Sequence, residues 1–62
     1  MLNLMQPVTT TCYKTTERWE TREDALRFYM RCIRNSEGHE RLRYENVVLD
    51  LMDGLDHATD HM

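Results

Sequence analysis

Hydrophobic and polar side chains follow three successive patterns along the chain, between two less regular ends. Residues 9–19 are rich in threonine with tyrosine and tryptophan among them, and such β-branched and aromatic residues favour a pleated strand. Residues 21–34 and 36–53 place apolar side chains every three or four positions, which is the spacing of an amphipathic helix. The pattern therefore predicts one strand followed by two helices, a small β-α-α protomer of the α+β class.

Capping residues indicate where the predicted helices begin and end. Thr21 is placed to accept a hydrogen bond from a free amide in the first turn of the first helix, with Asp24 three positions later as in a capping box. Ser36 is a candidate cap for the second helix, and Gly54 suits the position just after its last turn.

The two ends of the chain carry less pattern. Residues 1–8 form an apolar lead that ends near Pro7, which disfavours a regular element. Residues 56–62 are mostly polar, so we expect a fraying tail. An Asp-His pair occurs twice in this tail. If the tail were helical, His57 and His61 would share a face, which leaves a divalent-metal site as an alternative to the expected absence of metal.

The apolar face of each predicted helix is wider than one contact surface requires. It covers about 200° of residues 21–34 and about 220° of residues 36–53, whereas one contact needs about 100°. A lone strand also leaves backbone donors and acceptors unpaired at both edges, and a chain of about 60 residues builds only a marginal core. We therefore expect a second copy to complete the fold, as a homodimer or a higher symmetric oligomer.

Length and composition limit the class of protein. With 62 residues, 40% hydrophobic positions and a net charge of −3, the chain has room for a single small domain and is too apolar for obligate disorder. No apolar run approaches the roughly 18 residues of a membrane span, and the first five residues do not form a secretory signal. We expect a cytoplasmic protein without membrane contact, in which Cys12 and Cys32 stay reduced.

Charge is divided unevenly between the two halves of the chain. Residues 1–34 carry six basic and four acidic side chains, a net charge of +2, whereas residues 35–62 carry two basic and seven acidic ones, a net charge of −5. Arg27, Arg31 and Arg34 share one face of the first predicted helix, and guanidinium groups bind carboxylates and phosphates. This face is either a site for an anionic partner or a solvated surface with ordinary intrahelical ion pairs.

Aromatic rings and one further arginine complete the candidate binding residues. Arg41 either pairs with Glu45 four positions later or lines a pocket between subunits. Aromatic rings could stack on a nucleobase beside these cations. The candidate residues are Arg27, Arg31, Arg34, Arg41, Trp19, Tyr29 and Tyr44.

Catalytic chemistry has little support in the sequence. No cysteine has a neighbouring base, and two cysteines twenty residues apart do not supply a zinc site, so we expect no catalytic residue, no cofactor and no enzyme activity. General nucleic-acid binding is not expected either, because a net acidic protein of this size repels the phosphate backbone.

Two stretches resemble a family of short proteins. Residues 18–29 read Arg-Trp-Glu-Thr-Arg-Glu-Asp-Ala-Leu-Arg-Phe-Tyr, and residues 35–46 read Asn-Ser-Glu-Gly-His-Glu-Arg-Leu-Arg-Tyr-Glu-Asn. About half of the chain is thus similar to mostly uncharacterised proteins of phages and mobile elements of Firmicute-type bacteria. The resemblance implies a setting in which very small proteins inhibit host defence, as anti-CRISPR proteins do, or sequester defence nucleotides.

These observations lead to one expected function and two alternatives. We expect a non-enzymatic, homo-oligomeric binding protein that inhibits a bacterial defence component by stoichiometric binding. The first alternative is an oligomeric nucleotide sponge with arginine and aromatic pockets between subunits. The second alternative, a small enzyme, requires carboxylates in an apolar cleft, which a chain this short can form only between subunits.

Overall fold

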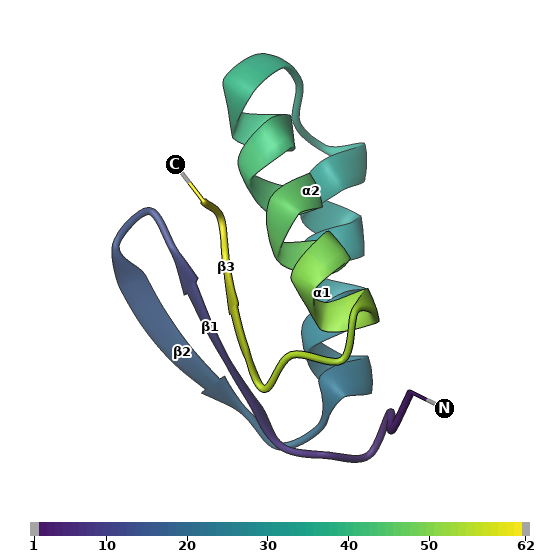
Figure 1. Cartoon of the computed structure of the whole chain (residues 1–62). Helices are drawn as coiled ribbons and strands as arrows, with labels where there is room; N and C mark the ends of the chain where they lie inside the picture. Colours follow the sequence, from purple (N-terminus) through teal and green to yellow (C-terminus); the bar gives the residue numbers. More distant parts are fainter. Residues whose placement is uncertain (1, 62) are drawn as a thin grey trace.

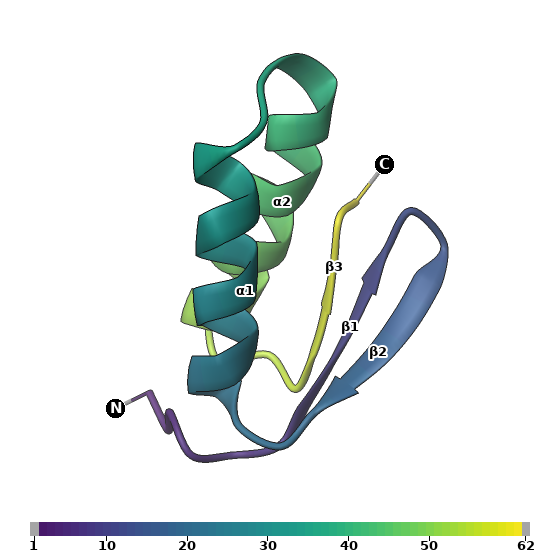
Figure 2. The same ribbon diagram turned by 180° about the vertical axis from the view of Figure 1, so that it is seen from behind.

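A three-stranded sheet lies beside a pair of helices in the computed structural model, which describes residues 2–61 (Figure 1). The elements follow in the order β1 (Val8–Cys12), β2 (Thr15–Trp19), α1 (Arg22–Arg34), α2 (Gly38–Met52) and β3 (His57–Thr59). The sheet order is β2-β1-β3, and the two helices cover one side of the sheet (Figure 2). The fold is therefore α+β, with a strand first and two helices after it, as the sequence predicts.

The predicted single strand over residues 9–19 is instead a hairpin. β1 and β2 pair antiparallel, with Val8 opposite Trp19 and Cys12 opposite Thr15. The chain reverses at Tyr13 and Lys14, whose φ angles are 53° and 62°. Two-residue hairpin turns commonly take positive φ at both positions, which glycine and asparagine favour. Neither residue is present here, so the turn gave no signal in the sequence.

The predicted fraying tail over residues 56–62 contains a third strand. β3 pairs parallel with β1, and backbone bonds from Thr9 N to Asp56 O (2.8 Å) and from Asp60 N to Thr11 O (3.2 Å) flank the pairing. β1 is therefore the central strand, with both edges paired inside the same chain. A second copy is not required to satisfy it, and Met62 lies outside the described residues.

The helix ends follow the predicted capping in two of three places. Thr21 is the N-cap of α1, and its hydroxyl accepts a hydrogen bond from Asp24 N at 3.1 Å. Gly54, with a φ of 90°, follows α2, where its N–H donates to Leu51 O and the next N–H donates to Asp50 O. This pair of bonds is a Schellman motif, in which glycine supplies the left-handed residue.

The predicted cap at Ser36 is wrong. Its hydroxyl donates back to Cys32 O at 2.7 Å and so satisfies a carbonyl at the end of α1. The N-cap of α2 is Glu37, whose side chain makes no capping bond, and the helix spans Gly38–Met52 instead of the predicted 36–53. A serine between two helices can satisfy either free carbonyls before it or free amides after it, and the tight connection here favours the carbonyls.

The core lies between β1, β3 and the inward faces of both helices. Its buried apolar residues are Val8, Cys12, Ala25, Leu26, Tyr29, Val47, Leu51 and Ala58. Thr10 is fully buried among them, with its hydroxyl bonded to Tyr29 Oη (2.8 Å) and accepting from Trp19 Nε1 (2.9 Å). This polar network joins the central strand to α1 and to the end of β2.

Arg22, the first residue of α1, is 1% exposed and donates five hydrogen bonds. Nη1 donates to Leu51 O and Leu55 O, both at 2.8 Å, and Nη2 donates to Gly54 O at 3.3 Å. These are carbonyls at or just beyond the C-terminus of α2, where unpaired oxygens and the negative end of the helix dipole attract a cation.

The N-terminal lead is also attached through Arg22 and the first turn of α1. The guanidinium donates to Asn3 O (3.2 Å) and Gln6 Oε1 (3.0 Å). In return, Gln6 O and Leu4 O accept hydrogen bonds from the backbone amides of Arg22 and Glu23. The lead thus caps α1, which the sequence did not indicate.

Replacing Arg22 by methionine should destabilise the fold strongly. Arg22→Met keeps an unbranched apolar stem but leaves several buried carbonyls without donors, so we expect the free energy of unfolding to fall by about 3–5 kcal/mol. Urea unfolding followed by circular dichroism measures the change. Arg18→Met on the exposed strand β2 is the matched control, with an expected change within about 0.5 kcal/mol. Equal stability of the two variants would contradict this role of Arg22.

Candidate functional site

Three of the predicted arginines lie along one open groove on α1. The groove has a volume of about 430 Å³, within the range of about 300–1,000 Å³ typical of ligand pockets. We call it the arginine groove, and its lining residues are Leu4, Glu23, Leu26, Arg27, Met30, Arg31 and Arg34. It is formed by Leu4 of the N-terminal lead and by one face of α1. α1 is the helix nearest the viewer in Figure 2.

The arginine groove combines apolar surface with available positive charge. Met30 is 47% and Leu4 40% exposed. Arg27 pairs with Glu23 at 2.9 Å, but both side chains are exposed, and such surface pairs contribute little stability. Arg31 and Arg34 form no ion pair within residues 2–61. The groove therefore presents cations that are not committed elsewhere in the described chain.

The outward face of α2 is apolar as well. Leu42, Leu49 and Met52 are 47%, 65% and 54% exposed, while Val47 and Leu51 are fully buried. Positions seven and three apart share one face of a helix. The wide apolar arc expected from the sequence is thus left partly uncovered by the chain itself. A homodimer or higher oligomer stays a prediction.

Arg41 lies apart from the arginine groove. Its Nε donates to Glu45 Oε2 at 3.2 Å on the exposed surface of α2. This is the i,i+4 pair that the spacing allowed. Arg41 does not line the groove.

Two of the three predicted stacking rings are structural. Tyr29 is buried and its hydroxyl bonds Thr10. Trp19 also bonds Thr10, and its ring lies 5.1 Å from that of Phe28 between centroids. These contacts hold both rings in aromatic packing between β2 and α1. Neither Trp19 nor Tyr29 lines the arginine groove.

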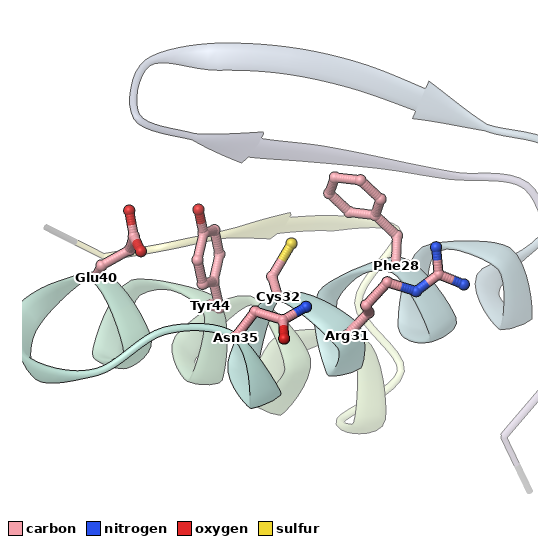
Figure 3. A pocket seen from close by; sticks show the side chains of 6 residues that line it. All are labelled: Phe28, Arg31, Cys32, Asn35, Glu40 and Tyr44. Carbon is pink, nitrogen blue, oxygen red and sulfur yellow. The ribbon is translucent and has the colours of Figure 1, made fainter.

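Tyr44 lines a second, smaller hollow, together with Arg31. We call it the β2 hollow, and its lining residues are Phe28, Arg31, Cys32, Asn35, Glu40 and Tyr44. Its volume is about 220 Å³, below the usual range for a drug-sized ligand. Phe28, Cys32, Glu40 and Tyr44 extend from the two helices toward the β1–β2 hairpin (Figure 3).

Most residues of the β2 hollow were absent from the sequence prediction. Phe28 and Cys32 belong to the wide apolar face of the first predicted helix, and Asn35 lies between the two predicted helices. No sequence pattern distinguishes an arc residue under a central strand from one under an edge strand. Only the position of β2 at the edge of the sheet shows that these side chains are partly exposed.

Both cysteines are free thiols with reduced acidity. Burial, reinforced by the nearby Asp60 carboxylate, raises the pKa of Cys12 to about 11. Burial and Glu40 also raise the pKa of Cys32. The thiolate is the nucleophilic form of cysteine, so both side chains remain protonated and weakly reactive at neutral pH.

The histidines near the C-terminus are held apart by separate contacts. His57 Nε2 bonds Thr11 Oγ1 at 2.8 Å on the sheet, and His61 Nε2 bonds Asp50 Oδ2 at 2.7 Å beside α2. The part of the chain that the structure describes contains no group of three or more His, Cys, Asp and Glu side chains placed to hold a metal ion. The helical tail on which the metal alternative depended is not formed.

Comparisons of the chain with protein-family models, with curated proteins and with solved structures found no match. Among residues 2–61, no helix combines the length and apolar character that crossing a membrane requires. The arginine groove and the β2 hollow are the candidate binding sites in the part of the chain that the structure describes.

The raised pKa of Cys12 predicts a loss of stability in alkaline solution. Its ordinary value of 9.0 applies to the unfolded chain, and the folded value is about 11. The folded state therefore holds the proton more tightly, and the resulting stability is complete below pH 9 and is lost as the pH rises toward 11. Cys12 alone should account for a decrease of up to about 2–3 kcal/mol.

Urea unfolding of wild-type protein and of Cys12→Ala between pH 7 and pH 11 measures this share. The pKa values of Tyr29, Tyr44 and Cys32 are raised too, so these groups add to the decrease in the free energy of unfolding of the wild type between pH 7 and pH 11. Cys32→Ala is the control and should retain the part of the stability loss that Cys12 causes. If the free energy of unfolding of Cys12→Ala falls with pH as steeply as that of the wild type, Cys12 is not the cause of the loss.

Proposed function

We propose that this protein is a non-enzymatic, stoichiometric protein inhibitor that holds its target in the arginine groove. The observation that carries the proposal is the placement of Arg27, Arg31 and Arg34 beside the exposed apolar side chains of Leu4 and Met30. Apolar surface with exposed guanidinium groups at its border complements a partner surface that is apolar at its centre and acidic around it.

The groove is better suited to a protein surface than to a small anion. Its polar groups lie on one exposed helix, whereas a site for a small ligand usually has polar groups converging from several directions. Arginine is enriched at protein interfaces because its guanidinium binds carboxylates in bidentate geometry and its stem packs on apolar surface.

The class of target comes from the resemblance to small proteins of phages and mobile elements. It suggests a component of bacterial defence, bound in the cytoplasm, with the inhibitor acting by occupying a surface of that component. A second copy of this chain is a further proposed partner, because the exposed apolar face of α2 is free for packing against another molecule.

Nucleotide sequestration has less support from the geometry. Of the residues proposed for that role, Arg31 and Tyr44 share the β2 hollow, while Tyr29 and Trp19 are engaged with Thr10. A hollow of about 220 Å³ has little room for a base, a ribose and a phosphate together. A nucleotide pocket would need a second subunit to complete it.

Charge reversal in the arginine groove should abolish inhibition. The double variant Arg27→Glu/Arg34→Glu repels an acidic partner surface but leaves Arg31, which also lines the β2 hollow. Wild-type protein is co-expressed with a panel of restriction and CRISPR systems, each challenged with its target plasmid. We expect plasmid survival to rise for at least one system. Binding to its purified component should weaken by about tenfold or more in the double variant.

The control is Lys14→Glu/Arg18→Glu, which changes the net charge equally on the β1–β2 hairpin. It should inhibit as wild type does, and circular dichroism should show that both variants remain folded. Inhibition by the groove variant at wild-type strength would contradict the site. Failure of wild-type protein to relieve any defence system would contradict the proposed target class.

A further inference from the structure

We propose that the free edge of β2 accepts an extended segment of another protein as a fourth strand, with one of its side chains seated in the β2 hollow. The inference goes beyond the proposed function, because it concerns the hairpin side of the molecule instead of the arginine groove. It depends on three features: an open strand edge, an uncovered inner face of β2 and a charge pattern that disfavours self-pairing.

The two edges of the sheet differ. On the β3 side, side chains of α2 contact the exposed backbone, with Asp50 Oδ2 accepting from Thr59 N at 3.1 Å and Asn46 Nδ2 donating to Asp60 O at 2.8 Å. On the β2 side, no strand lies beyond Thr15–Trp19 within residues 2–61. Alternate backbone N–H and C=O groups of β2 are therefore available to a further strand.

The helix layer does not extend fully under β2. Directly opposite residues of an antiparallel pair lie on the same face of the sheet. Glu17 and Thr15 are opposite Thr10 and Cys12, which are buried against the helices. Yet Glu17 and Thr15 are themselves exposed, although they face the helix side. An added strand would therefore have open space beneath its inward side chains.

The β2 hollow is lined by residues of the helix layer, several of which extend toward the hairpin, and its volume is large enough for a side chain. Phe28 and Tyr44 contribute aromatic surface, Cys32 lies between them, and all three extend toward the hairpin (Figure 3). Phe28 is 43% exposed in spite of its contact with Trp19. An apolar side chain from an added strand would cover this surface, as pockets for alternate side chains do in other sheet-edge complexes.

A second copy of β2 is a poor occupant of the edge. In a symmetric antiparallel pair of two β2 strands, with the helices of both copies on the same side of the sheet, one residue lies opposite its own copy at the centre. This residue is Thr16, Glu17 or Arg18. Centring on Glu17 or Arg18 places that residue opposite its own copy, and like charges directly opposite each other destabilise a strand pair. Centring on Thr16 pairs only residues 15–17 of each copy, because Lys14 lies in the turn. The pattern favours a strand from a different protein, with a basic residue opposite Glu17 and an acidic residue opposite Arg18.

The probe is a synthetic peptide that carries this pattern. Its core is Val-Glu-Lys-Thr-Phe, flanked by threonine at each end, acetylated and amidated. In antiparallel pairing its glutamate lies opposite Arg18, its lysine opposite Glu17, and its phenylalanine reaches the β2 hollow. The reversed sequence tests parallel pairing. Titration of ¹⁵N-labelled protein by NMR should shift the amides of residues 15–19 together with those of Phe28, Cys32 and Asn35.

Matched controls separate this pairing from nonspecific binding. Exchanging the glutamate and lysine of the peptide should weaken binding by about threefold to tenfold, because both cross-strand pairs become like-charged. The protein variant Glu17→Lys/Arg18→Glu should show the reverse preference and bind the exchanged peptide better. Replacing the peptide phenylalanine by alanine should also weaken binding, whereas Arg27→Glu/Arg34→Glu in the protein should leave it unchanged.

Four results would overturn the proposal. They are the absence of shifts with either peptide orientation at millimolar concentration, equal binding of both charge patterns, shifts confined to the arginine groove, and concentration-dependent β2 shifts without peptide, which would indicate self-pairing. Reversal of preference in the charge-exchanged protein supports the strand pairing, whereas unchanged binding of the alanine peptide would contradict the seating of a side chain in the β2 hollow.

Discussion

The buried guanidinium of Arg22 is the interaction on which the arrangement of the elements depends. It lies at the start of α1 and donates to three carbonyls at or just beyond the end of α2, to the backbone of the lead and to the Gln6 side chain. Removing a cation from water carries a large desolvation penalty unless it is fully hydrogen-bonded, and here all five donors are used. One side chain therefore fixes where three separate parts of the chain meet.

This junction also determines the direction of the C-terminal segment. The Schellman turn at Gly54 ends α2 beside Arg22, and Asp56 lies 3.6 Å from the guanidinium before β3 begins. The chain then runs along β1 in the parallel direction. At the far end of β3, the Asp60 carboxylate accepts from Tyr13 N and from Arg43 Nη1. β3 has only three residues, so these contacts at both ends are what keep so short a strand in register.

The sequence predicts those parts of the fold that depend on local periodicity and capping. Thr21 and Gly54 act as predicted because their bonds reach only a few residues along the chain. The hairpin gave no signal because its turn residues are Tyr13 and Lys14. β3 and the role of Arg22 depend on contacts between distant positions, such as Thr9 with His57 and Arg22 with Leu51. In the candidate site, the common face of Arg27, Arg31 and Arg34 was predictable from helical spacing. The β2 hollow was not, because it exists only where an edge strand leaves an apolar arc uncovered.

Arg31 belongs to both proposed binding surfaces, since it lines the arginine groove and the β2 hollow on either side of α1. A guanidinium directed toward a carboxylate in the groove is no longer available to an occupant of the hollow. If both surfaces are used, their occupants therefore affect each other through a single side chain, and thermodynamic linkage makes the effect equal in both directions. A domain with one small core has few positions at which two sites can be coupled, and the exposed side of α1 supplies one.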